Sequence, residues 1–294
     1  MEAIRISNLT KDYGGNKGVF DVNLSVNKGE VYGFLGPNGA GKTTTIRHLM
    51  GFIKSDKGTC YINDLNCWEN SANIQKNLGY LPGEIAFMNN MTGFQMIEFI
   101  ATMKNMKDLS KAKELMERFE LDPKGKIRKM SKGMKQKIGI VCAFMNNPDV
   151  IILDEPSSGL DPLMQNVFID LILEEKNKGK TIFMSSHIFE EVERTCDRTA
   201  IIKDGKIISI EDMKSLGNKK SKSYIITFNS SDSVEEFKGK GFRIAEIVDN
   251  TVTVNIKDNL QPLLKEISTL GVKDLDIKTQ TLEELFLHFY GGEK

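Results

Sequence analysis

The nine residues 36–44 constrain this chain more than any other stretch. They follow a short apolar run and precede an amphipathic one, so the local order is predicted to be strand, loop and helix. Glycines let such a loop curl until successive backbone N–H groups point at phosphate oxygens, and the following helix adds its positive end. Lys42 is expected to reach the β- and γ-phosphates of a nucleotide, and the Thr43 hydroxyl to bind Mg²⁺. The predicted nucleotide-binding residues are Gly36, Pro37, Asn38, Gly39, Ala40, Gly41, Lys42, Thr43 and Thr44.

Composition narrows the possible partners and compartment. The 294 residues carry 40 basic and 40 acidic side chains, so no nucleic-acid partner is expected on electrostatic grounds. The four cysteines show no C-x-x-C spacing, which favours reduced thiols and the cytosol. The N-terminus lacks a signal-peptide pattern, and no apolar run approaches the ~20 residues that span a bilayer. Any membrane role is therefore expected to run through a separate chain.

The order of patterns along the chain predicts two domains. Residues 1–213 alternate strands and helices around a helical segment at about 84–147, where most of the 14 methionines lie. These methionines suit either an adaptable partner surface or the filling of a helical core. The polar, basic stretch 214–222 predicts a linker. Residues 223–294 read strand, helix, strand, strand, helix, strand, which predicts a small ferredoxin-like α+β module, with a last amphipathic helix from Thr281.

A tyrosine precedes the phosphate-binding loop in a short glycine-rich segment. Tyr13 is followed by two glycines and lies between two runs that alternate as half-buried strands do. An aromatic ring in this place can stack on a nucleotide base without reading its edge. Packing within the protein is the other interpretation, and the residue by itself does not decide between the two.

Two carboxylates and a histidine are expected at one edge of the sheet. Asp154 and Glu155 end a continuous apolar run, which is typical of a parallel strand buried on both faces. Ligands bind at the carboxyl ends of such strands. Asp154 is therefore predicted to hold Mg²⁺ and Glu155 to orient or deprotonate the attacking water. His187 follows a second buried strand and is expected at the same edge, where it can bond a γ-phosphate.

Taken together, these motifs resemble the ATP-binding cassette of ABC transporters over about residues 4–210. The run 130–136 looks like the family's signature, 158–161 like its D-loop, His187 like its switch histidine and Tyr13 like the aromatic that stacks on adenine. The resemblance implies an α/β P-loop fold, with a mixed sheet core and antiparallel β and helical subdomains. It also implies two cassettes closing head to tail around two ATP molecules. In that arrangement Ser131 and Gly133 would cap the γ-phosphate held by Lys42 of the other cassette, and Asp161 of the D-loop would bind nucleotide at the same interface.

The chain departs from the family pattern in two places. The signature carries Lys132 and Met134 where glycine and glutamine are usual. The loop that normally offers a glutamine to Mg²⁺ and to the transport subunit has Gly83, followed by Glu84. Either Glu84 takes the place of that glutamine as a metal ligand or water does.

The function that this resemblance implies is ATP hydrolysis coupled to transport. The chain is similar to the nucleotide-binding subunits of bacterial ABC transporters, of the single-cassette export and drug-resistance type with a C-terminal extension. Lys42, Glu155 and His187 would then be the catalytic residues, ATP and Mg²⁺ the bound species, and a separate permease the membrane partner. The second cassette would be an identical chain or a paralogue. A soluble ABC-type ATPase acting on ribosomes or DNA is the alternative.

Overall fold

The computed structural model describes residues 1–219, 222–256 and 259–279. Contacts divide the chain into two compact units, Met1–Met213 and Lys214–Lys294. Each unit is described by itself. No helix in the described part of the chain is long and apolar enough to cross a membrane.

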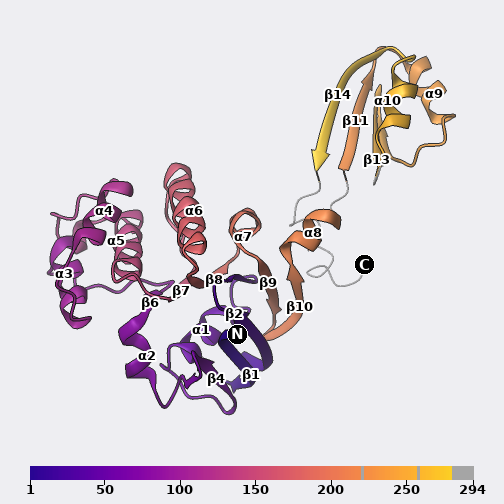
Figure 1. Cartoon of the computed structure of the whole chain (residues 1–294). Coiled ribbons are helices and arrows are strands. Elements are labelled where there is room, and N and C mark those ends of the chain that lie inside the picture. The colour runs from indigo at the N-terminus through magenta and orange to yellow at the C-terminus, as the bar shows by residue number, and fades with distance from the viewer. Residues whose placement is uncertain (220–221, 257–258, 280–294) are drawn as a thin grey trace. The chain divides into compact units, whose positions relative to one another are not determined.

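A six-stranded sheet carries the phosphate-binding loop and the carboxylates (Figure 1). Its strands, in spatial order, are β10 (Lys206–Asp212), β9 (Arg198–Lys203), β3 (Val31–Leu35), β8 (Thr181–Ser186), β7 (Val150–Asp154) and β6 (Leu78–Leu81). Only β10 runs antiparallel to its neighbour within this sheet. Every residue of β3, β7 and β8 is buried, as expected of strands covered on both faces. Parallel pairing places Leu35 beside Ser186 and Asp154 beside Ser185, so the functional ends of three strands meet.

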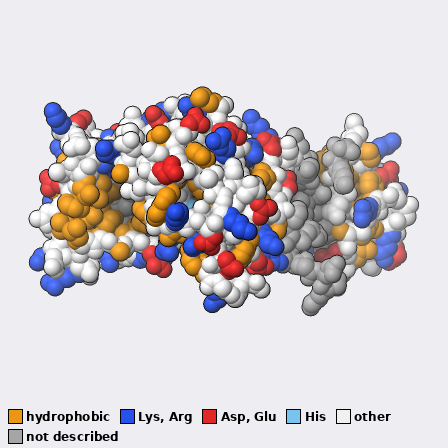
Figure 2. Space-filling view, turned by 90° about the horizontal axis from the view of Figure 1, so that it is seen from below, with side chains coloured by type: hydrophobic (Ala, Val, Ile, Leu, Met, Phe, Trp, Pro, Cys, Tyr) orange, Lys and Arg blue, Asp and Glu red, His pale blue; other side chains and the backbone are white. Residues whose placement is uncertain are grey.

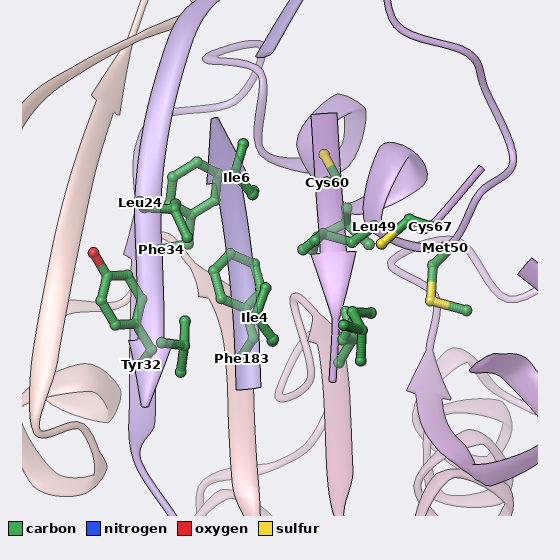
Figure 3. Close-up of a cluster of buried hydrophobic side chains, with 14 of the residues drawn as sticks. Ile4, Ile6, Leu24, Tyr32, Phe34, Leu49, Met50, Cys60, Cys67 and Phe183 are labelled. Atoms are coloured by element: carbon green, nitrogen blue, oxygen red, sulfur yellow. The ribbon is translucent and has the colours of Figure 1, made fainter. Parts of the chain in front are cut away.

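A four-stranded sheet forms the antiparallel subdomain. Its order is β2 (Gly18–Asn27), β1 (Glu2–Asp12), β4 (Lys57–Ile62) and β5 (Leu65–Asn66). In β2 buried and exposed residues alternate, as the sequence predicted. Figure 3 shows the inward side chains of this four-stranded sheet, among them Ile4 and Ile6 of β1 and Leu24 of β2. They pack with Phe34 and Phe183 of the larger sheet and with Leu49 of the first helix. This shared core fixes the antiparallel sheet against the first helix.

Helices precede or follow strands of the larger sheet along the chain. Their bounds are α1 (Lys42–Leu49), α2 (Ser71–Asn77), α6 (Pro162–Asn177) and α7 (Phe189–Thr195). Asp161 caps α6 by accepting a hydrogen bond from Met164 N, and Pro162 opens the helix. The segment between β8 and α7 holds His187.

The helical segment contains α3 (Gly93–Met103), α4 (Ser110–Arg118), a 3-10 turn η1 (Ile127–Lys129) and α5 (Lys132–Phe144). Thr92 and Gln95 form a capping box for α3, and Ser131 caps α5 as predicted. Of the clustered methionines, Met96 and Met145 are buried, whereas Met88 and Met103 are 48% and 67% exposed. Figure 2 shows hydrophobic side chains gathered at the end of the first unit where this helical segment lies, on the left of the view. Met96 and Met145 therefore fill the helical core, and a partner surface stays a prediction for the exposed methionines.

The part of the second unit that the structure describes contains a four-stranded antiparallel sheet, with helices in the connections between its strands. Its elements are β11 (Lys222–Phe228), α9 (Ser231–Lys238), β12 (Ile244–Val248), β13 (Thr251–Ile256), α10 (Gln261–Ile267) and β14 (Val272–Thr279). The sheet order β12-β13-β11-β14 places a strand between the two ends of each β-α-β unit. The buried cluster of this unit includes Tyr224, Phe228 and Phe237. The helix predicted from Thr281 lies outside the described residues.

The predicted linker at 214–222 begins where the first compact unit ends, and it is partly helical. Helix α8 occupies Met213–Lys219, so most of this stretch is regular. Met213 and Leu216 are both buried and stand three residues apart, which places them on one helix face. The charged residues around them gave the stretch the composition of a linker and hid this short apolar period.

Candidate ATP-binding and hydrolysis site

The loop after β3 holds the Lys42 ammonium in place with backbone carbonyls. Nζ donates to Gly36 O at 2.5 Å and to Pro37 O at 3.2 Å, and the residue is only 5% exposed. Gly41 caps α1 in the left-handed region at φ 108°, where a Cβ would lie 2.7 Å from Val19 Cγ1. Glycine is therefore required there by both conformation and space. The arrangement aims a fixed positive charge and a helix N-terminus at one point.

An open cavity of about 590 Å³ lies over this loop. The sequence-predicted residues that line it are Tyr13, Pro37, Asn38, Gly39, Gly41, Lys42, Thr43, Thr44 and Glu155. Gly36 and Ala40 are buried beneath the loop instead. Tyr13 is 55% exposed, and its ring centroid lies 6.0 Å from Lys11 Nζ. An exposed aromatic face at the cavity rim has the placement that base stacking needs.

Five further residues complete the cavity wall, and none of them was predicted from the sequence. The additional lining residues are Asn16, Lys17, Gly18, Asp204 and Gly205. Gly205 packs on the β2 start, since its backbone carbonyl accepts from Phe20 N at 2.8 Å and a Cβ on it would lie 2.4 Å from Gly18 O. Asp204 and Gly205 have the turn composition of the β9–β10 connection. That composition predicts a turn but gives no sign that the turn borders a ligand cavity.

Thr43 and Asp154 meet as a candidate Mg²⁺ site. Thr43 Oγ1 donates to Asp154 Oδ2 at 2.8 Å, and Ser185 Oγ donates to Asp154 Oδ1 at 2.5 Å. Asp154 is fully buried, so Ser185 fixes the direction of its carboxylate. One hydroxyl and one carboxylate suit Mg²⁺, which keeps several waters and takes substrate phosphate oxygens. Within the described residues, no cluster of three His, Cys, Asp or Glu side chains could hold a metal unaided.

The loop at Gly83 approaches the same carboxylate. A Cβ on Gly83 would lie 3.1 Å from Asp154 Oδ2, so this residue leaves space that a larger side chain would enter. Glu84, the other candidate ligand of the metal, is exposed to solvent. The structure thus brings Gly83, rather than the neighbouring acid, against the predicted metal ligand.

Glu155 joins the phosphate-binding lysine to the histidine. Its Oε1 lies 3.0 Å from Lys42 Nζ, and its Oε2 lies 2.5 Å from His187 Nδ1. The backbone of Glu155 is in the left-handed region at φ 49°, a conformation that costs roughly 1–3 kcal/mol for a residue other than glycine. Ser185 holds this conformation, because its carbonyl and hydroxyl oxygens both accept from Glu155 N. The two predicted catalytic side chains are therefore in contact.

The signature and D-loop residues lie together, apart from the cavity wall. Lys132 Nζ donates to Ser158 Oγ at 2.8 Å, and a Cβ on Gly133 would lie 2.6 Å from Gly159 O. Ser131 is exposed at the start of α5. Asp161, predicted to bind nucleotide, uses its side chain as the α6 cap. Ser131, Gly133 and Asp161 do not line the cavity of their own chain.

Comparisons with known proteins agree with this geometry. Residues 19–158 match the family model described as ABC transporter. The chain is 38% identical to the bacitracin transport ATP-binding protein of Bacillus licheniformis, over 70% of this chain and 68% of that protein. It is 31% identical to the linearmycin resistance ATP-binding protein of Bacillus subtilis, over 98% of each. A solved ATP-binding subunit of an ABC transporter has a TM-score of 0.67 and 29% identity, over 74% of this chain and 92% of that one.

These matches confirm the predicted cassette fold and the family resemblance. The relative from Bacillus subtilis extends the likeness beyond the cassette, because it is aligned over almost the whole chain. A phosphate-binding loop, a buried carboxylate beside Thr43 and a second carboxylate between Lys42 and His187 are what ATP hydrolysis requires of a cassette. This chain belongs to the ATP-binding cassette ATPases of ABC transporters.

Proposed function

We propose that this chain is the ATP-hydrolysing subunit of an exporter, working on the cytosolic face of a membrane through a separate permease. The observation that carries the hydrolytic assignment is the position of Glu155, whose carboxylate contacts both Lys42 and His187 at the wall of the cavity. A single carboxylate between a phosphate-binding cation and a neutral hydrogen-bonding ring is well placed to direct a water at a γ-phosphate.

Each side chain has one part in this mechanism. Lys42 binds the β- and γ-phosphate oxygens, which takes its ammonium away from Glu155. The freed carboxylate accepts a hydrogen bond from water and orients it toward phosphorus. As Lys42 leaves the carboxylate, His187 shifts the hydrogen bond of its single N–H from Glu155 to the γ-phosphate. Water adds to the γ-phosphorus as the bond to ADP breaks, giving ADP, phosphate and a proton.

The metal part of the proposal rests on Thr43 and Asp154. Their oxygens lie 2.8 Å apart, and they would hold Mg²⁺ together with water and phosphate oxygens. The ion supplies charge neutralisation of the phosphates when bound. Ser185 contributes by keeping the buried Asp154 carboxylate pointed at Thr43.

A second cassette completes the site in this proposal. Ser131 and Gly133 stand at the start of α5 but lie outside the cavity that holds Lys42 of the same chain. A helix N-terminus is a favourable place for an anion, and this one is free to approach the ATP of another copy. A homodimer satisfies the arrangement, because one chain carries both halves of the site.

The direction of transport is inferred from the relatives. One is named for bacitracin transport and another for linearmycin resistance, and the latter covers both units of this chain. Removal of a toxic compound from the cell is the role that these names favour. A soluble cassette acting on ribosomes or DNA is not favoured, since the relatives carry transport and resistance names.

We expect a membrane protein to be encoded beside this gene, and its co-expression with this chain tests the proposal. We expect the two proteins to purify together from membranes and the complex to hydrolyse ATP with Mg²⁺. Sedimentation of the active chain with ribosomes, without any membrane partner, would overturn the transport assignment and leave the ATPase assignment intact.

A further inference from the structure

One buried carboxyl lies behind the His187 segment and has no part in the mechanism above. Glu191 is on α7 and is 3% exposed. Its Oε2 accepts a hydrogen bond from Ser186 Oγ at 2.7 Å. The same hydroxyl oxygen accepts from Ile188 N at 3.0 Å. The residues immediately before and after His187 are therefore both tied to one hydroxyl, and that hydroxyl is tied to Glu191.

The other oxygen of Glu191 faces the Glu155 segment. Oε1 is buried without a hydrogen-bond partner. Glu191 and Ser157 both line a pocket of about 160 Å³, and Ser157 stands two residues after Glu155. Glu191 is thus placed between the backbone segment that carries the histidine and the one that carries the carboxylate.

Burial of the Glu191 carboxyl lowers the stability of the fold, unless its contacts compensate or it contributes to the reaction. Leaving a buried polar atom unpaired costs about 1–3 kcal/mol. Among the described residues, no Lys or Arg forms an ion pair with Glu191, since the nearby Arg194 pairs with Glu190 and bonds Asn166. Burial raises the pKa of Glu191 to about 7, against the opposing effect of the Ser186 and Ser157 hydroxyls. About half of the Glu191 carboxyls are therefore protonated at pH 7, and the neutral form tolerates burial with few hydrogen-bond partners better than the charged form does.

We propose that Glu191 is a positioning residue for the hydrolytic step, which fixes His187 against Glu155 through the Ser186 hydroxyl. This inference rests on the proposed role of His187. The 2.5 Å contact between His187 and Glu155 needs the histidine backbone held on both sides, because His187 itself is 51% exposed on its loop. Ser186 alone cannot provide that hold, since its hydroxyl rotates unless a buried acceptor fixes it.

Steady-state ATP turnover of four single variants of the full chain tests the proposal. Glu191→Ala should lower kcat on the order of 10²-fold, the loss that a misplacement of about 1 Å produces, at unchanged KM for ATP. Glu191→Gln should keep kcat within about threefold of the unchanged chain, because its amide oxygen still accepts from Ser186. Ser186→Ala should match Glu191→Ala. Glu190→Ala is the matched control, since Glu190 is the exposed neighbour on the same helix, and it should leave kcat unchanged.

The double variant Glu191→Ala with His187→Ala decides whether Glu191 acts through the histidine. We expect it to retain the same residual turnover as His187→Ala alone. Losses that multiply, or a KM that rises while kcat stays constant, would overturn the inference. If Glu191→Ala does not fold, Ser186→Ala and its double variant with His187→Ala decide the question in the same way. Wild-type turnover in His187→Ala would instead refute the proposed role of the histidine.

Discussion

The Lys42 ammonium lies 3.0 Å from the Glu155 carboxylate, although the two residues are assigned to different tasks. Lys42 is 5% exposed and the Glu155 side chain 19% exposed, so little water solvates either charge. Each charge is therefore stabilised mainly by the other. Nucleotide binding must exchange this pair for a lysine–phosphate pair. In the proposed mechanism Glu155 is therefore free to orient water only after a phosphate has bound Lys42. The carboxylate does not act before ATP is in place.

Exchange of this ion pair predicts opposite behaviour for two variants. Glu155→Gln should bind ATP but hydrolyse it at least about 10²-fold more slowly, since general-base catalysis is lost. It should remain dimeric with ATP and Mg²⁺. Lys42→Ala loses a charge-assisted phosphate contact, so it should bind ATP weakly and stay monomeric. Size-exclusion chromatography with ATP, paired with phosphate release, measures both. Near wild-type turnover in Glu155→Gln would pass the hydrolytic role to another group.

Tyr13 predicts a base-stacking signature. Tyr13→Ala should weaken ATP binding by about 1–3 kcal/mol, whereas Tyr13→Phe and Tyr13→Trp should be nearly silent. Titration with a fluorescent ATP analogue gives the affinities. Equal losses for the Ala and Phe variants would indicate that the hydroxyl, rather than the ring, makes the contact.

Glu84 offers a test of the loop that lacks the usual glutamine. Its side chain is exposed while Gly83 faces Asp154, so we expect water to complete the metal shell. Glu84→Ala should then need the same Mg²⁺ concentration for half-maximal turnover, and Asp154→Asn should need far more. A matching shift in both variants would make Glu84 a metal ligand.

The second unit should be dispensable for chemistry. All the candidate catalytic residues lie within Met1–Met213, the first compact unit. A chain ending after that unit should keep its ATP turnover, with altered dimerisation. The measurement is phosphate release at several protein concentrations. Complete loss of turnover in a truncation that gives a native circular dichroism spectrum would contradict this prediction.

Glu191 predicts a pH-dependent stability difference. Its folded-state pKa of about 7 lies above the ordinary value of 4.5, so the folded chain binds the extra proton between these values. Stability from this group therefore falls as pH rises from about 4.5 to 7, by roughly 3 kcal/mol in all. Glu191→Gln removes that loss. It should match the unchanged chain near pH 4.5 and be more stable at pH 8, as measured by urea unfolding.

The groups that share the Glu191 environment set a control for this comparison. Glu155 and His187 act on it from the strand ends, and Glu190 and Arg194 share its pocket wall. Glu190→Gln should show no such divergence with pH, because Glu190 is exposed. A pH-independent offset for Glu191→Gln would mean that its carboxyl is ionised throughout.

Local patterns predicted the elements that place the site. The phosphate-binding loop, the buried strand before Asp154 and the Ser131 cap each depend on residues close in sequence, so they could be read directly. Ser185 could not, because its importance comes from parallel pairing of β8 with β7, which sets it beside Asp154. Such a contact depends on register between strands far apart in the chain.

Glu191 illustrates the same difficulty for burial. It lies in the run 190–194, whose three acids and one arginine suggest a solvated helix face. Only the packing of α7 turns one of these acids inward while its neighbour Glu190 stays exposed. Likewise, the polar composition of the predicted linker gave no sign of helix α8, in which Met213 and Leu216 are buried.

The bond between Lys132 and Ser158 has a consequence for cooperativity. It ties the start of α5, which would cap the ATP of the other cassette in the proposed dimer, to the segment that follows a chain's own Glu155. In a head-to-tail dimer, a rearrangement around one water-directing carboxylate is thereby passed to the neighbouring ATP within a single polypeptide. The dimer would contain two such links, one in each chain, and each would connect one ATP site to the other. The two ATP molecules are therefore expected to be hydrolysed in a coordinated order rather than at random.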